Sequence, residues 1–249
     1  MKTLKNIQTL IIGSLALFAI ILVCKPVQAN PSETVHKILF VVSSDEHGYW
    51  LPEVLEPYQV VTAAGYEVDI ASPKGKSGTA RGTFQLSRKQ RDWFAQSHLK
   101  TRLNNSIALA DITSTHYSAI YFAGGAGPMF DFHNNKVLQN LTREIYEQGG
   151  LVAADCHGPA ALINVTLSDG TRLVRGKKIT AKANHEEGNW ARNNYPFLLE
   201  DKFKSIGAIY SSVAKGQPHV VVDQRIITGQ NPASAMPMAK ALVQKLANL

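Results

Sequence analysis

Adjacent Cys156 and His157 are the residues of this sequence whose types and spacing best suit covalent chemistry. A cysteine thiolate is a strong nucleophile at neutral pH, and a neighbouring imidazole can take the proton from the thiol. The pair lies between a short apolar run at 151–154 and the segment 159–162, which suits the first turn of a helix. This strand–turn–helix order predicts a nucleophile elbow at Cys156, with backbone N–H groups facing an oxyanion and a helix N-terminus favouring the thiolate.

The alternative for Cys156 is an inert cysteine that packs as a small hydrophobic residue. The adjacent His157 and the strand–turn–helix setting favour the reactive interpretation. The same choice arises for the acidic residues considered below, because a glutamate on an amphipathic helix or in a Glu-Glu pair is most often a solvated surface charge.

The segments around this pair predict one doubly wound α/β domain. Apolar runs at 37–44, 66–71 and 118–123 are typical of strands buried in a parallel sheet, and helical spacing recurs at 51–64 and 137–148. This alternation of strands and helices favours right-handed crossovers. The remaining expectations are a polar insertion beside the sheet at 76–111, a strand starting at 178–180, a hairpin at 220–228 and a closing helix at 232–249.

The N-terminus predicts a secretory signal peptide over residues 1–29. Lys2 and Lys5 precede an apolar run at about 10–23, and Val27-Gln28-Ala29 has the small-residue form of a cleavage site. An uncleaved membrane anchor is the second interpretation, but the run is shorter than the roughly 20 residues that span a bilayer. A lipoprotein signal at Cys24 is the third, although Val23 stands where such a signal normally has a small residue.

Cleavage near Ala29 predicts an exported protein, periplasmic or secreted, whose single domain covers residues 30–249. The leader holds three lysines and no acidic residue, so its removal lowers the formal charge from +7 to +4. No run of basic residues is interleaved with aromatics, so nucleic acid is not expected as a partner. Cys156 becomes the only thiol of the mature chain, which excludes an internal disulfide.

Four motifs in order resemble the PfpI family within the class I glutamine amidotransferase-like superfamily, and more narrowly its branch of heat-shock chaperones and glutathione-independent glyoxalase III proteins. The resemblance covers nearly the whole mature chain. The motifs are the helix start Pro52-Glu53-Val54-Leu55-Glu56-Pro57, the turn from Gly124-Gly125 to Asp131-Phe132, the elbow Ala154-Asp155-Cys156-His157-Gly158-Pro159 and the tail Ile227-Thr228-Gly229-Gln230-Asn231-Pro232-Ala233-Ser234.

The resemblance implies a flavodoxin-like fold with Cys156 as the nucleophile and His157 as its neighbouring base. It places the acidic member of a triad at Glu187, with Glu186 as the alternative. Glu53 matches a buried glutamate that hydrogen-bonds the nucleophile's sulfur. The backbone N–H groups of Gly125 and His157 match an oxyanion hole.

The implied function is a glyoxalase III-like reaction, in which methylglyoxal and water give lactate through a hemithioacetal on Cys156. The chemistry needs a base near the thiol but no organic cofactor and no metal, so none is expected. The expected partner is a small aldehyde or dicarbonyl. The alternatives are a stress-related holdase chaperone with unfolded clients and a cysteine peptidase or amidase, and a homodimer is a further hypothesis.

Several residues around the site depart from the family pattern. Ala126 stands where a histidine usually follows the two glycines, and His185 stands where a third acidic residue usually precedes the glutamate pair. Asp155, directly before the nucleophile, is expected to raise the pKa of the thiol. His47 and His185 flank the site but lack the spacing of metal ligands.

Overall fold

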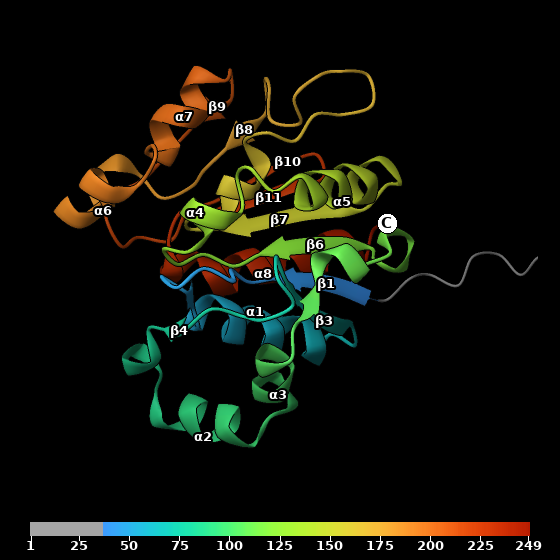
Figure 1. Cartoon of the computed structure of the whole chain (residues 1–249), viewed down its shortest axis with the longest axis vertical. Helices are drawn as coiled ribbons and strands as arrows, with labels where there is room; N and C mark the ends of the chain where they lie inside the picture. The colour runs from blue at the N-terminus through green and yellow to red at the C-terminus, as the bar shows by residue number, and fades with distance from the viewer. Residues whose placement is uncertain (1–36) are drawn as a thin grey trace, which may run out of the picture. The chain divides into compact units, whose positions relative to one another are not determined.

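The computed structural model describes residues 37–249, and the predicted signal peptide and Cys24 lie outside that part of the chain. Its centre is a seven-stranded sheet (Figure 1) in which every neighbouring pair is parallel except β10 and β11. Across the sheet the strands are β10 (Val220–Asp223), β11 (Ile226–Gly229), β7 (Leu151–Asp155), β6 (Ala119–Phe122), β1 (Lys37–Val41), β3 (Glu67–Ser72) and β5 (Ile107–Ala108). The predicted mainly parallel α/β sheet is therefore confirmed.

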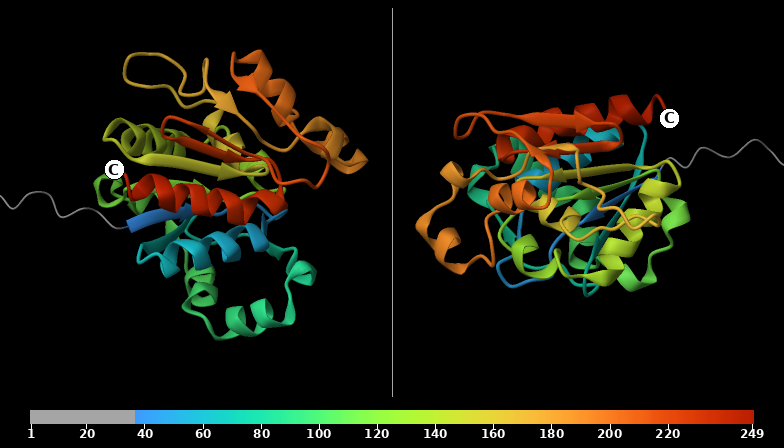
Figure 2. Two further views of the ribbon diagram at one scale, coloured as in Figure 1. Left: turned by 180° about the vertical axis from the view of Figure 1, so that it is seen from behind. Right: turned by 90° about the horizontal axis from the view of Figure 1, so that it is seen from above.

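Helices cover both faces of this sheet, as expected. Helices α1 (Pro52–Ala63) and α8 (Ala235–Leu246) pack on one face, and α5 (Lys136–Glu147) packs on the other (Figure 2). Alternate residues of β1 point to opposite faces: Phe40 joins the core beneath α1 and α8, and Leu39 joins the core beneath α5. Burial on both faces explains why the strand reads as a continuous apolar run.

The segment expected as an insertion at 76–111 is only partly outside the sheet. Its helices α2 (Arg88–Gln96) and α3 (His98–Asn104) lie beside the domain, whereas its strand β5 pairs with β3 and forms the sheet edge. A second short pair joins β2 (Tyr49–Trp50) to β4 (Ala80–Arg81). The short 3-10 helices of this half are η1 (Thr83–Gln85), η2 (Leu109–Asp111) and η3 (Ser114–His116).

A second outlying segment follows the elbow. The strand expected at 178–180 is β8 (Lys178–Ile179), and it pairs with β9 (Ile209–Tyr210) in a small sheet of its own. The hairpin expected at 220–228 is confirmed as the antiparallel pair of β10 and β11. The other helices are α4 (Pro128–Asp131), η5 (Asn184–Glu186), α6 (Asn189–Asn194), α7 (Leu199–Ser205) and η6 (Pro232–Ser234).

The helix expected after the elbow differs from its prediction. Residues Gly158–Leu162 form a five-residue 3-10 helix, η4, which does not continue as an α-helix. The closing helix likewise starts as the 3-10 turn η6 before α8. Within residues 37–249 we find no helix with the length and apolar character needed to cross a membrane.

The strand order places a switch point at the centre of the sheet. From β1 the chain builds β3 and β5 on one side, then returns to build β6 and β7 on the other. Ligands of open α/β sheets bind beyond the carboxyl ends of the strands at such points. Strand β6 leads there to Gly124 and Gly125, and β7 leads there to Cys156.

Candidate active site

Cys156 follows β7 in a backbone conformation that side chains rarely adopt. Its φ is 57°, in the left-handed region. The Cys156 N–H donates to Gly229 O at 3.0 Å, and its carbonyl accepts from Lys182 N–H at 2.9 Å. The side chain is 5% exposed. Two neighbouring segments therefore hold the sharp turn that was predicted at this residue.

Glycines let three backbone segments meet around the sulfur. A Cβ on Gly124 would lie 2.3 Å from Glu53 Oε2 and 2.7 Å from the Cys156 Cβ, and one on Gly158 would lie 2.2 Å from Phe122 O. Any side chain at these two positions would displace the nucleophile or its neighbours. Steric contact therefore explains why glycine stands at both of these positions.

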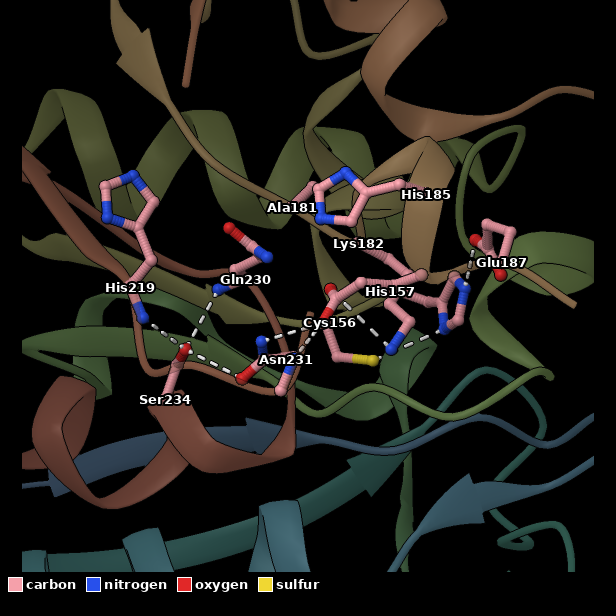
Figure 3. Close-up of polar contacts among 12 residues, drawn as sticks. Cys156, His157, Ala181, Lys182, His185, Glu187, His219, Gln230, Asn231 and Ser234 are labelled. Atoms are coloured by element: carbon pink, nitrogen blue, oxygen red, sulfur yellow. Dashed lines mark hydrogen bonds and ion pairs between the residues drawn. The ribbon is translucent and has the colours of Figure 1, made fainter. Parts of the chain in front are cut away.

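Cys156, His157 and Glu187 form a continuous chain of contacts (Figure 3). Cys156 Sγ lies 3.4 Å from His157 Nδ1, and His157 Nε2 lies 2.8 Å from Glu187 Oε1. Because a carboxylate only accepts, the Glu187 contact places the imidazole proton on Nε2 and leaves Nδ1 free to accept the thiol proton. The structure thus brings these three predicted site residues together in the order that base catalysis requires.

Glu186, the alternative triad residue, faces another way. Its Oε1 accepts from Gly216 N–H at 2.8 Å and from Asn231 Nδ2 at 3.0 Å. Its Oε2 lies 3.7 Å from Lys182 Nζ. These contacts give the tail motif a structural task, since Asn231 holds the carboxylate that accompanies Lys182.

Glu53 is fully buried beside the nucleophile, at the start of α1. Neither carboxyl oxygen has a hydrogen bond of normal geometry among the described residues. Burial raises the pKa of Glu53 to about 8, although the adjacent Cys156 thiol, Lys182 and Gly124 N–H oppose the rise. The carboxyl is therefore mostly protonated at neutral pH and can release its proton with little free energy.

The resting state of Cys156 differs from the sequence expectation. Burial raises the pKa of the thiol well above its ordinary range, Glu53 raises it further, and Lys182 opposes both. The expected help from a helix N-terminus is outweighed, because η4 is only five residues long and the sulfur is desolvated. Asp155 also raises the pKa, as expected. The thiol therefore needs a base at the moment of attack.

Asp155 is a second fully buried carboxyl behind the nucleophile. Neither of its oxygens has a hydrogen-bond partner among residues 37–249. Burial, and then Glu53, raise the pKa of Asp155 well above its ordinary value. Burial thus favours the neutral form of Asp155 next to Cys156.

The backbone N–H groups assigned to the oxyanion hole lie at the carboxyl ends of neighbouring strands. Gly125 has a φ of 110° and packs against Tyr49 and Trp50. The N–H groups of Gly125 and His157 have no acceptor among residues 37–249. Both residues line the cavity that contains Cys156, so both can serve a bound oxygen.

This cavity has a volume of about 240 Å³. Four of its lining residues were not among the predicted site residues: Trp50, Lys182, Tyr195 and Pro232. The Tyr195 ring packs edge-on against the His157 ring at 5.2 Å and keeps it in place. The sequence carried two usable signals for these residues: Pro232 belongs to the tail motif, and Lys182 follows the strand start at 178–180.

The histidines near the site make other contacts. His47 Nδ1 lies 2.6 Å from Asp45 Oδ1, and its ring stacks on Phe130 at 4.4 Å. His185 Nε2 lies 3.1 Å from Val213 O. Within the described residues no cluster of three or more histidine, cysteine or acidic residues has the geometry to hold a metal ion. Ala126 lines the cavity, and its small side chain leaves more space there than the histidine that usually follows the two glycines.

Comparison with known proteins gives consistent matches. The sequence pattern of the DJ-1/PfpI family matches residues 36–245. The glutathione-independent glyoxalase HSP31 of Saccharomyces cerevisiae is 29% identical over 86% of this chain and 96% of its own length. The crystal structure of glyoxalase III from Candida albicans superposes with a TM-score of 0.79 at 28% identity, covering 85% of this chain and 97% of that chain. The crystal structure of the Rapid Encystment Protein REP24 of Francisella tularensis superposes with a TM-score of 0.79 at 37% identity, covering 84% of this chain and 98% of that chain.

Proposed function

The chain belongs to the DJ-1/PfpI family, and from this premise we propose that it is a cysteine enzyme converting 2-oxoaldehydes such as methylglyoxal, with water, into 2-hydroxy acids. The observation that carries the proposal is the contact chain from Cys156 through His157 to Glu187, beside the buried Glu53, in one cavity. Relatives that match nearly their whole length carry the name glutathione-independent glyoxalase.

The first step is addition of Cys156 Sγ to the aldehyde carbon. His157 Nδ1, at 3.4 Å, takes the thiol proton while the C–S bond forms. The aldehyde oxygen gains negative charge and is met by the N–H groups of Gly125 and His157. Protonation of that oxygen gives a hemithioacetal and leaves the imidazole neutral again. Glu187 stabilises the imidazolium between these two proton transfers.

The second step moves a hydrogen between the two carbonyl carbons. A base removes the proton from the former aldehyde carbon, and the electron pair forms an enediol with the neighbouring carbonyl. Reprotonation of that neighbouring carbon gives a 2-hydroxy thioester on Cys156. The ionised form of Glu53, a minor fraction at neutral pH, accepts this proton and then returns it, because a pKa of about 8 keeps both forms accessible.

The last step is hydrolysis. Water adds to the thioester carbon, the C–S bond breaks, and the sulfur recovers a proton as the 2-hydroxy acid leaves. The sum is one dicarbonyl and one water converted to one 2-hydroxy acid, with no change in total oxidation state. The protein side chains supply only acids, bases and a nucleophile, so these steps call for no added redox group.

Turnover of methylglyoxal to lactate tests the proposal. We expect lactate from the purified chain and none from Cys156→Ala, with lactate and residual methylglyoxal measured in the same samples. Lactate no higher than the Cys156→Ala background would overturn the proposal. Suppression of client aggregation that survives Cys156→Ala would instead favour the chaperone hypothesis. The homodimer hypothesis is tested separately, by measuring the mass of the protein in solution.

The exported location is a further part of the proposal. It rests on the leader-like composition of residues 1–29. Mass spectrometry of the protein recovered from its native compartment should give an N-terminus at Asn30. An intact N-terminus at Met1 or a lipid on Cys24 would contradict this cleavage.

A further inference from the structure

Lys182 brings a cation into the cavity of the nucleophile. Its backbone N–H donates to Cys156 O at 2.9 Å, so the residue is tied to the elbow itself. Its side chain is 18% exposed, and Figure 3 shows it beside Cys156 and His157. Among the residues that line the cavity it is the only lysine or arginine. The chemistry proposed above assigns it no task.

The ammonium group of Lys182 has unused hydrogen-bond donors. Its nearest carboxylate oxygen, Glu186 Oε2, is 3.7 Å away, which is an ion pair without a hydrogen bond. The other Glu186 oxygen is occupied by Gly216 and Asn231. No acceptor among residues 37–249 lies within hydrogen-bond distance of Lys182 Nζ. Lys182 lines the cavity, so its N–H donors are available there to a ligand or water.

Charge around the cavity keeps this lysine cationic. Burial alone would lower the pKa of Lys182, but its interactions with the ionisable groups around it, first Cys156 and then Glu186, outweigh burial and raise it. The two deepest carboxyls, Glu53 and Asp155, are held towards their neutral forms by burial. Glu187 is engaged by His157. Lys182 is thus the charged group with unfilled hydrogen bonds beside the sulfur.

We propose that Lys182 forms a carboxylate subsite beside Cys156, so that the cavity prefers carbonyl compounds that carry a carboxylate over neutral ones of the same size. A carboxylate on the substrate would accept from Nζ while the carbonyl carbon meets Sγ. Trp50, Tyr195 and Pro232 line the same cavity with apolar surface, which lowers the local dielectric constant and strengthens this pairing. The inference rests on the proposed function for the identity of the reacting group.

Alkylation of Cys156 gives a test that needs no turnover. Iodoacetate and iodoacetamide are nearly equal in size, and they differ in charge. Both react with the thiolate and release iodide, so the ratio of their rates cancels the thiolate fraction and reports the charge felt by the reagent. Peptide mass spectrometry of the full chain counts modification at Cys156 separately from Cys24.

We expect Lys182→Met to lower the iodoacetate-to-iodoacetamide rate ratio by about tenfold, because a unit charge acts at close range in a partly buried site. Lys182→Arg keeps the charge and should preserve the ratio. Lys178→Met, which removes an exposed lysine of the same segment, is the matched control and should also preserve it. A Lys182→Met ratio within about twofold of wild type would overturn the subsite.

A second measurement uses only the wild-type chain, in case Lys182→Met does not fold. Its rate ratio should exceed that of N-acetylcysteine amide, a free thiol without a carboxylate, under the same conditions, and a lower ratio would overturn the proposal. Failure of methylglyoxal turnover with a raised ratio would reject the proposed reaction and keep the anion subsite. Turnover with an unraised ratio would reject the subsite alone.

Discussion

His157 Nε2 lies 2.8 Å from Glu187 Oε1, with only 9% and 4% of the two side chains exposed. Thirty positions separate the two residues in the chain. The contact exists because Lys182 N–H is bound to the Cys156 carbonyl, which brings the segment after β8 alongside the elbow. The orientation of the imidazole at Cys156 thus depends on a segment outside the main sheet.

Glu187→Gln should lower kcat by about a hundredfold. The amide can donate to Nε2, which favours the imidazole tautomer that carries its proton on Nδ1 and cannot accept from the thiol. KM for methylglyoxal should change little, because Glu187 does not line the cavity. Steady-state kinetics measures both, with the surface substitution Glu144→Gln as the control. A kcat within twofold of wild type would contradict this role.

Glu53→Gln should flatten the dependence of stability on pH. Burial raises the pKa of Glu53 from 4.5 to about 8, so between these values the folded chain binds more protons than the unfolded chain. Stability then falls as pH rises through this window, by on the order of 3 kcal/mol for this group. Glutamine mimics the protonated form and does not titrate.

Urea unfolding at pH 5, 6, 7 and 8 measures this effect at constant ionic strength. Asp155 adds a fall of the same sign, which Glu53→Gln weakens because Glu53 raises the pKa of Asp155, so the difference between Glu53→Gln and wild type reports both effects of Glu53. That difference should grow in favour of Glu53→Gln as pH rises. Parallel pH curves would show that Glu53 does not titrate as described.

The fold could be predicted from the sequence because its central strands β1, β6 and β7 are buried on both faces. Such strands read as apolar runs whatever covers them, and the glycines at 124, 125 and 158 mark close backbone approaches. The sharp turn at Cys156 was also predictable from the local sequence, because an apolar run precedes it and a helix start follows it. The pairing of His157 with Glu187 came from a resemblance, because nothing in local spacing joins residues 30 positions apart.

The features of the site that could not be predicted from the sequence depend on tertiary contacts. The direction of the Cys156 pKa follows from desolvation and from Glu53, which reaches the sulfur from α1. The position of Lys182 follows from one backbone hydrogen bond and from the burial of Glu186 against the loop at Gly216. The periodicity of apolar residues carries no information about such contacts, so the sequence does not distinguish a lysine that lines a cavity from one on the surface.

Gly124→Ala should destabilise the fold by about 1–3 kcal/mol and strongly reduce turnover. The added methyl would lie 2.3 Å from Glu53 Oε2 and 2.7 Å from the Cys156 Cβ, so both must move. Thermal unfolding and methylglyoxal kinetics measure the two effects. Gly188→Ala is the control, since its methyl would meet nothing within 4 Å. Equal stability of the two variants would show that the site tolerates the extra atom.

Cys156→Gly should be more stable than Cys156→Ala, although both are inactive. The φ of 57° strains any residue with a Cβ but not glycine, so the expected gain is about 1 kcal/mol in the free energy of unfolding. Gln224 has a similar φ of 54° in the β10–β11 turn, and Gln224→Gly should gain a similar amount without loss of turnover. Ala154→Gly, within β7, should instead lose stability. If Cys156→Gly is no more stable than Cys156→Ala while Gln224→Gly gains stability, the elbow holds no strain, and the position of the nucleophile depends on its hydrogen bonds alone.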